Sequence, residues 1–176
     1  VTDYISSATG SLGTAYGAHT GIGTMPIFLY GTEEQKQKYL PVLTAGEKFG
    51  AYCLTEPGAG SDANSGKTTA TLTEDGKNYL INGQKMWISN AGYANLFIVF
   101  ARIESDKYIT GFIVERGTEG LTFGEEEHKM GIHGSATCVM HFDDAKGYLI
   151  GEAHRGLNAM FIMMNSARIA VGLQGL

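Results

Sequence analysis

Two short segments of the chain carry residue types that could bind a flat heterocycle with polar edges. They are residues 52–62 (YCLTEPGAGSD) and residues 86–90 (MWISN). Glycines let a backbone approach a ligand closely because they carry no side chain, and hydroxyl groups can bond to the rim of a ring while an indole packs against it. The hydroxyls and the indole in question belong to Thr55, Ser61, Ser89 and Trp87. Together these residue types predict a flavin site.

The glycines of the first segment also fit a second ligand class. Residues 58–63 (GAGSDA) match the G-x-G-x-x-A pattern of dinucleotide-binding folds. That pattern needs a helix to begin at the glycines, because the helix N-terminus receives the pyrophosphate. Residues 66–74 continue instead as a strand-like stretch, so no Rossmann site is expected. A plain Pro-Gly loop would explain the glycines but not the flanking Thr55 and Ser61.

Trp87 is the single tryptophan of the chain. A lone tryptophan in a strand is most often a core residue, which is one interpretation. Side chains alternate between the two faces of a regular strand. Trp87 and Ser89 would then share one face, opposite Met86 and Ile88. An indole and a hydroxyl on one face suit an aromatic ligand with a polar rim, which is the second interpretation.

Other reactive residue types form no recognisable constellation. The histidines at positions 128, 133, 141 and 154 follow no familiar zinc spacing, so no metal site is expected. Cys53 and Cys138 lie inside apolar runs and are expected to be buried free thiols in a reducing compartment, with a disulfide as the alternative. We find no Ser-His-Asp or Cys-His pattern that would indicate a nucleophile.

Charge and hydropathy exclude two further classes of partner. The net charge is −5 with a pI near 5.5, and Lys and Arg form no cluster, so nucleic acid is not expected as a partner. The sequence contains no apolar run of about 18 residues, so no membrane span is expected. The chain also starts without a basic leader region or an initiator Met. We therefore expect it to be part of a longer protein.

The first 48 residues predict helices. Residues 3–30 are rich in Ala, Gly, Ser and Thr, with glycines at positions 13, 17 and 21. This four-residue spacing of small residues favours close packing of helices. Thr32 and Gln35 form a capping box that opens the next helix. Pro41 is expected to kink or restart that helix.

From Phe49 onward, short stretches rich in β-branched and aromatic residues are separated by Gly, Asn and Asp. The strand candidates are residues 49–55, 66–74, 77–90, 95–103, 108–115, 121–129 and 136–142. This many short strands predict a barrel or a sandwich. Asp75-Gly76 and Asp143-Asp144 are expected to be turns, and Asn82-Gly83 a turn or a bulge. Residues 156–176 are apolar around most of their circumference, which predicts a buried helix.

Residues 52–62 and 82–91 resemble the two signature segments of the acyl-CoA dehydrogenase family. Supporting matches run along the whole chain, at residues 30–36, 38–41, 112–115, 129–131 and 167–170. The joint occurrence of these segments in this order is very specific. Two further stretches are most similar to the long members that resemble 3-methylmercaptopropionyl-CoA dehydrogenase, namely residues 129–135 (KMGIHGS) and 160–168 (MFIMMNSAR).

The resemblance implies an α+β multidomain fold with a helical segment, a middle antiparallel β-barrel and the start of a C-terminal helical bundle. Residues 1–48 would end the N-terminal helical domain, residues 49–150 would form the barrel, and residues 151–176 would be the truncated first helix of the C-terminal domain. Family assembly implies a homotetramer or a homodimer. The implied location is the bacterial cytoplasm or the mitochondrial matrix, with the cytoplasm favoured.

The resemblance also implies FAD as the cofactor and an acyl-CoA thioester as the substrate. Thr55 would hydrogen-bond the isoalloxazine ring, and Trp87 would contact its edge. The residues expected to bind FAD are Tyr52, Leu54, Thr55, Gly60, Ser61, Trp87, Ile88 and Ser89. The residues expected to lie near the substrate are Ser61, Asn165 and Arg168.

Family chemistry implies that a carboxylate removes the α-proton of the acyl group while the β-hydrogen leaves as hydride to the flavin, giving a trans-2-enoyl-CoA. An electron-transferring flavoprotein would then take the electrons. Two alternatives are an acyl-CoA oxidase, in which oxygen takes the electrons, and a non-catalytic relative that binds flavin or acyl-CoA. In some members the catalytic Glu precedes the Arg, where this chain has Ala167 before Arg168. No catalytic base is identifiable, so we expect the chain to be inactive by itself.

Overall fold

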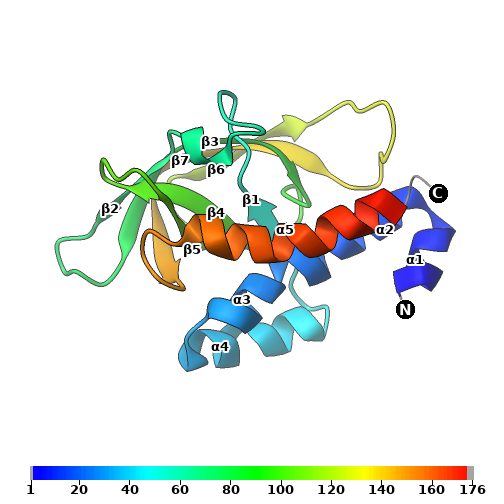
Figure 1. The fold of residues 1–176 in the computed structure, drawn as a ribbon, viewed down its shortest axis with the longest axis horizontal. Coiled ribbons are helices and arrows are strands. Elements are labelled where there is room, and N and C mark those ends of the chain that lie inside the picture. Colours follow the sequence, from blue (N-terminus) through cyan, green and yellow to red (C-terminus); the bar gives the residue numbers. More distant parts are fainter. Residues whose placement is uncertain (1, 174–176) are drawn as a thin grey trace.

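The computed structural model describes residues 2–173. Helices gather along one side of a β-barrel (Figure 1). The helices before the barrel are α1 (Thr2–Ala8), α2 (Gly10–Gly17), α3 (Met25–Tyr30) and α4 (Glu33–Thr44), and a π-helical segment, Ala18–Gly23, joins α2 to α3. Helix α5 (Gly156–Leu173) follows the barrel and packs against both the barrel and α3. Within residues 2–173, no helix combines the length and the apolar character that a membrane span requires.

The predicted strands are confirmed. They are β1 (Gly50–Cys53), β2 (Thr69–Leu72), β3 (Tyr79–Ser89), β4 (Leu96–Ile103), β5 (Ile109–Glu115), β6 (Leu121–Glu126) and β7 (Thr137–Ile150). Pairing runs from β4 through β2, β3, β7 and β5 back to β4, which closes a barrel. The predicted β-barrel is confirmed and most of its pairings are antiparallel, but β1 and β2 both run parallel to β4. Parallel neighbours need a long crossover connection. The chain between β1 and β4 contains β2 and β3, and the chain between β2 and β4 contains β3, so both connections are long enough.

Strand β7 is longer than predicted. Asp143 and Asp144 lie within it and not in a turn. Opposite them the pairing register shifts: Ile81 pairs with Ala145 and Gly83 with Phe142, so two residues of β7 oppose the single Asn82. Asn82-Gly83 is thus no turn but lies opposite a bulge in β7. The Asn82 side chain accepts a hydrogen bond from Asp144 N (2.9 Å) and donates one to Asp144 Oδ1 (2.7 Å). Because these bonds bridge the bulge, the strand continues through the two aspartates.

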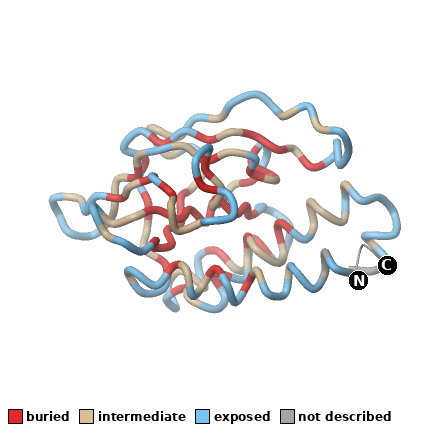
Figure 2. The backbone as a smooth tube through the Cα atoms, turned by 45° about the horizontal axis from the view of Figure 1, so that its top comes forward, coloured by how far each residue is buried: buried red, intermediate tan, exposed pale blue. Residues whose placement is uncertain are grey.

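The buried residues form two apolar cores. Figure 2 colours the buried parts of the backbone red. One fills the barrel and includes Phe97 and Phe112. The other joins the barrel to the helices and includes Ile98 and Met160. Strands β1 and β4 contribute to both cores, because alternate side chains of a strand point to opposite faces. Cys53 and Cys138 both belong to the barrel core and are free thiols, as predicted.

The π-helical segment holds the start of β1. His19 Nε2 donates to Leu43 O (3.2 Å), and Gly50 N donates to His19 Nδ1 (3.1 Å). Since Nδ1 must accept, the buried imidazole is neutral with its proton on Nε2, and burial lowers the pKa of His19. Gly23 and Gly50 meet backbone to backbone, because a Cβ built on Gly23 would lie 2.6 Å from the Gly50 carbonyl carbon.

Helix α4 begins with the predicted capping box. Gln35 N donates to Thr32 Oγ1 (3.2 Å), and Thr32 N donates to Gln35 Oε1 (3.0 Å). The helix runs through Pro41 to Thr44, so the predicted restart at the proline is wrong. Tyr39 and Leu43 are buried on either side of Pro41. Their packing holds the helix across the hydrogen bond that proline cannot make.

Two predictions about helix packing hold only in part. Helix α5 forms where predicted, but it buries one stripe, at Met160 and Met163, and leaves Ile162 and Ile169 55% and 77% exposed. Leu157 and Met164 are partly buried beside this stripe. The predicted close packing of the early glycines occurs at Gly13, where an added Cβ would lie 2.9 Å from Ser6 Oγ, but not at positions 17 and 21, where it would meet nothing within 4 Å.

Candidate functional site

The two signature segments meet at the end of β1. After Cys53 the chain leaves the strand and forms the signature loop, residues 54–66, before β2 begins. Met86 N on β3 donates a hydrogen bond to Thr55 O at 3.0 Å. This bond places the first part of the signature loop beside the segment that contains Trp87 and Ser89. The structure therefore brings together the two groups of residues predicted from the sequence.

Strand β3 carries a bulge at Trp87. The pairing register with β7 shifts between Lys85 and Ile88, and Trp87 has a φ of 57°. Regular alternation is interrupted at the bulge, so the two-residue period by itself does not place Trp87 and Ser89 on one strand face. The core interpretation of Trp87 is wrong, because the side chain is 61% exposed. A bulky residue at positive φ costs about 1–3 kcal/mol, and such strain is concentrated at functional sites.

The remaining predicted flavin contacts differ in burial. Leu54, Thr55 and Ser89 are half-buried, Ile88 is buried, and Gly60 and Ser61 are exposed on the outer part of the signature loop. Tyr52 is 8% exposed and packs on Phe100 with 5.0 Å between ring centroids. Its hydroxyl oxygen is buried and has no hydrogen-bond partner within the described residues. A buried hydroxyl without a partner is costly, which indicates that a polar group outside these residues satisfies it.

Two of the three predicted substrate residues lie on α5. Asn165 and Arg168 are exposed, whereas Met160 and Met163 on the same helix pack into the core that contains Tyr52. Helix α5 thus shares an apolar core with Tyr52. The structure does not bring Asn165 or Arg168 into contact with the signature loop.

A cleft of about 460 Å³ lies elsewhere, between α3, the first turns of α5 and the barrel. Leu29, Phe100 and Ile162 are among its lining residues, and Arg155 and Glu152 provide charge. It contains none of the predicted site residues. Within the part of the chain that the structure describes, no three His, Cys, Asp or Glu side chains are close enough together to hold a metal ion.

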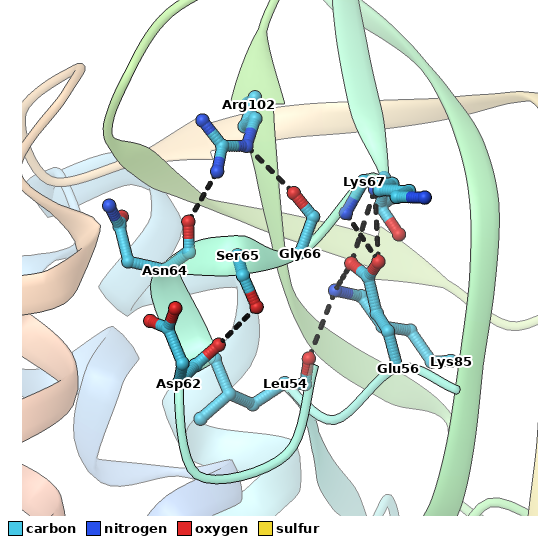
Figure 3. A network of polar contacts seen from close by, with 10 residues as sticks. Leu54, Glu56, Asp62, Asn64, Ser65, Gly66, Lys67, Lys85 and Arg102 are labelled. Carbon is cyan, nitrogen blue, oxygen red and sulfur yellow. Dashed lines mark hydrogen bonds and ion pairs between the residues drawn. The ribbon is translucent and has the colours of Figure 1, made fainter. Parts of the chain in front are cut away.

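The sequence analysis missed a buried ion pair that ties the two signature segments together (Figure 3). Lys85 Nζ lies 2.7 Å from Glu56 Oε1 and donates a second hydrogen bond to Leu54 O at 3.1 Å. The two side chains are 2% and 7% exposed. Lys85 is separated from Ile81 by an even number of strand positions, which places a charge on the core face. Such a charge needs a partner, and this signal could have revealed the pair.

Glu56 also holds the return of the signature loop toward β2. Its carboxylate accepts hydrogen bonds from Lys67 N (2.5 Å) and from Thr68 N (3.2 Å). Burial alone would raise the pKa of Glu56, but the Lys85 ammonium and these hydrogen bonds outweigh it and lower the pKa. Burial lowers the pKa of Lys85, and the Glu56 charge opposes that shift. A Cβ on Gly66 would come within 2.8 Å of Glu56 Oε1, so the loop passes close to the carboxylate there.

Arg102 on β4 fixes the last part of the signature loop (Figure 3). Its guanidinium donates to Gly66 O at 2.7 Å and also to Asn64 O. A further nitrogen donates to Asp106 O (2.8 Å) and Lys107 O (3.1 Å) in the turn after β4. The signature loop is therefore held at its start by Lys85 and at its end by Arg102, while the stretch containing Gly60 and Ser61 projects outward between them.

Comparison with known proteins assigns the chain to a family. The model of the acyl-CoA dehydrogenase N-terminal domain matches residues 1–47, and that of the middle domain matches residues 51–145. A probable acyl-CoA dehydrogenase of Bacillus subtilis is 48% identical over 174 residues, which cover 96% of this chain and 29% of the relative.

Two solved structures have the same fold at high similarity. An acyl-CoA dehydrogenase from Bacillus anthracis, complexed with FAD, superimposes with a TM-score of 0.91 at 45% identity, covering 95% of this chain and 29% of that one. Butyryl-CoA dehydrogenase from Megasphaera elsdenii gives a TM-score of 0.91 at 39% identity, covering 97% and 46%. The chain spans less than half the length of these relatives. The family predicted from the signature segments is confirmed, and the chain belongs to the acyl-CoA dehydrogenase family.

Proposed function

We propose that the protein is an FAD-dependent dehydrogenase that converts an acyl-CoA thioester to the trans-2-enoyl-CoA. The observation that carries the proposal is the hydrogen bond from Met86 N to Thr55 O, which joins the two signature segments. The FAD complex of the Bacillus anthracis relative supports the choice of cofactor.

The residues at this junction fit a flavin. Trp87 presents an exposed indole, and the unpartnered Tyr52 hydroxyl provides a buried polar group. Thr55 and Ser89 carry hydroxyls close to the junction, and these suit the polar rim of an isoalloxazine ring. The side chains and backbone that we propose to hold FAD are those of Tyr52, Leu54, Thr55, Gly60, Ser61, Trp87, Ile88 and Ser89.

A bound flavin supplies the hydride-accepting chemistry of such a reaction. The protein's own residues bind and orient the reactants: Thr55 and Ser89 hold the rim of the ring, and Trp87 excludes water from one side. We propose that Ser61, Asn165 and Arg168 face the substrate. Ala167 stands before Arg168, where some members carry the catalytic Glu. We therefore propose that residues 1–176 alone do not turn over an acyl-CoA, which turnover by this isolated segment would disprove.

We also propose the wider setting of the enzyme. Electrons would pass to an electron-transferring flavoprotein, and the protein would assemble as a homotetramer or a homodimer in the bacterial cytoplasm. The buried free thiols of Cys53 and Cys138 and the Bacillus subtilis relative support a reducing bacterial compartment. We place the domain limits at residues 48 and 150, in the connections that flank the barrel.

An anaerobic visible spectrum of the full-length protein tests the function. Saturated acyl-CoAs of several lengths, including 3-methylmercaptopropionyl-CoA, are added one at a time. We expect one of them to bleach the flavin absorbance, which would also identify the acyl group. Bound flavin that no acyl-CoA reduces would contradict the proposal, and rapid peroxide formation in air would indicate an acyl-CoA oxidase instead.

A further inference from the structure

The buried ion pair flanks the junction between the two signature segments on both sides. Glu56 directly follows Thr55, and Lys85 directly precedes Met86, whose N–H bonds to Thr55 O. Lys85 Nζ also donates to Leu54 O at 3.1 Å. The backbone at Leu54 and Thr55 is therefore bound to β3 by a side chain and by the main chain within two residues.

The hydrogen bonds of Lys85 and Glu56 are directional. Lys85 reaches one carboxylate and one carbonyl, and the same carboxylate accepts from the amides of Lys67 and Thr68. An apolar pair of the same volume could fill this space, often without loss of stability. It could bond neither to the Leu54 carbonyl nor to those two amides. The distinctive contribution of the charged pair is thus the placement of the loop.

The pair also lies beside the strained residue of the site. Trp87 keeps a φ of 57° two positions after Lys85 and one position before the buried Ile88. A strained backbone persists only where its surroundings over-determine it. The anchored Lys85 on one side and Ile88 on the other provide that constraint.

We propose that Glu56 and Lys85 are positioning residues, whose buried ion pair sets the place of Thr55 and Trp87 in the flavin site without touching the flavin itself. The inference rests on the proposed function, because it needs FAD at this junction. It extends the site to two residues whose charges act on the ligand only through the backbone that they hold.

The test compares the full-length protein with Glu56→Gln, Lys85→Met and the double variant. In Glu56→Gln the side-chain amide oxygen can still accept from the two loop amides, so this change removes mainly the charge. The double variant removes both charges and so avoids leaving one buried charge without a partner, which favours folding. A double change of the exposed ion pair between Lys38 and Glu115 (2.6 Å), Lys38→Met with Glu115→Gln, is the matched control.

Two quantities are measured: the dissociation constant of FAD and the visible spectrum of the FAD-saturated protein. We expect the double variant to fold, to bind FAD about tenfold more weakly and to lose the resolved shoulders of the flavin band, while the control stays within about twofold of wild type. We expect each single variant to bind FAD at least as weakly as the double variant does. A single variant can therefore replace the double variant in the test if the double variant does not fold.

The outcomes separate the two proposals. A folded double variant with wild-type affinity and a wild-type spectrum would overturn the positioning role. The same conclusion would follow if the variants lost only stability in urea while the saturated flavin spectrum stayed unchanged. If the wild-type protein bound no flavin, the proposed function itself would fail, and the positioning role with it.

Discussion

Replacing Gly23 by alanine should destabilise the protein, whereas the same change at Gly21 should stabilise it. Both glycines lie in the π-helical segment, Ala18–Gly23, that packs against the start of β1. A Cβ on Gly23 would lie 2.6 Å from the Gly50 carbonyl carbon and 2.8 Å from Ala18 O. A Cβ on Gly21 would meet nothing within 4 Å. The two variants therefore differ in whether the added Cβ meets the backbone of Gly50 and Ala18 or open space.

The geometry sets the size of the effect. Ordinary Cβ contacts begin at 3.4 Å, so the backbone of Gly50 must move away from Gly23 by about 3.4 − 2.6 = 0.8 Å. Overpacking of this kind costs about 1–3 kcal/mol. At Gly21 the alanine gains about 0.5–1 kcal/mol from its higher helix propensity and the reduced entropy of the unfolded chain. The free energies of unfolding of the two variants should then differ by about 1.5–4 kcal/mol.

Urea or thermal unfolding of wild type and both variants measures this difference. For a chain of this size, each kcal/mol changes Tm by about 2–4 °C, so we expect Gly23→Ala to unfold several degrees below Gly21→Ala. Equal stability of the two variants would refute the reasoning. So would a Gly23→Ala protein as stable as wild type, because the close approach to Gly50 would then be unnecessary.

Two further predictions concern buried polar groups. The pKa of His19 is lowered by burial, so on acidification the unfolded chain binds a proton first, and the free energy of unfolding falls as the pH drops from about 6.5 toward the lower folded-state pKa. His19→Gln should flatten this slope in urea titrations between about pH 5 and 8, and an unchanged slope would contradict the assignment. Thr110→Val should cost about 1–3 kcal/mol, because Thr110 Oγ1 accepts a hydrogen bond from His154 N at 2.8 Å; a Tm equal to that of wild type would argue against this contribution.

Features that depend on neighbours in the sequence were predictable. The capping box of Thr32 and Gln35 forms as expected, because its two hydrogen bonds join residues three apart. The turn at Asp75-Gly76 also forms, with Gly76 at a φ of 69°. The barrel strands follow from local composition and turn residues, which report on a pleated, half-buried backbone. In each case the deciding contacts lie within a few residues.

Features that depend on distant partners were not predictable in the same way. Pro41 lies within α4 because Tyr39 and Leu43 are buried around it. Asp143 and Asp144 stay in β7 because Asn82 on the neighbouring strand bridges the bulge. Local propensity alone favours a break at each of these places, and tertiary packing overrides it.

The candidate site shows the same division. The sequence by itself determined the family and the two signature segments, because both rest on residue identity in order along the chain. Only the tertiary structure decided that Trp87 lies exposed in a bulge and that Glu56 pairs with Lys85, 29 residues away. A strand pattern predicts which face a side chain occupies, but it cannot say which distant charge meets it in the interior, because that partner is chosen by the closure of the whole barrel.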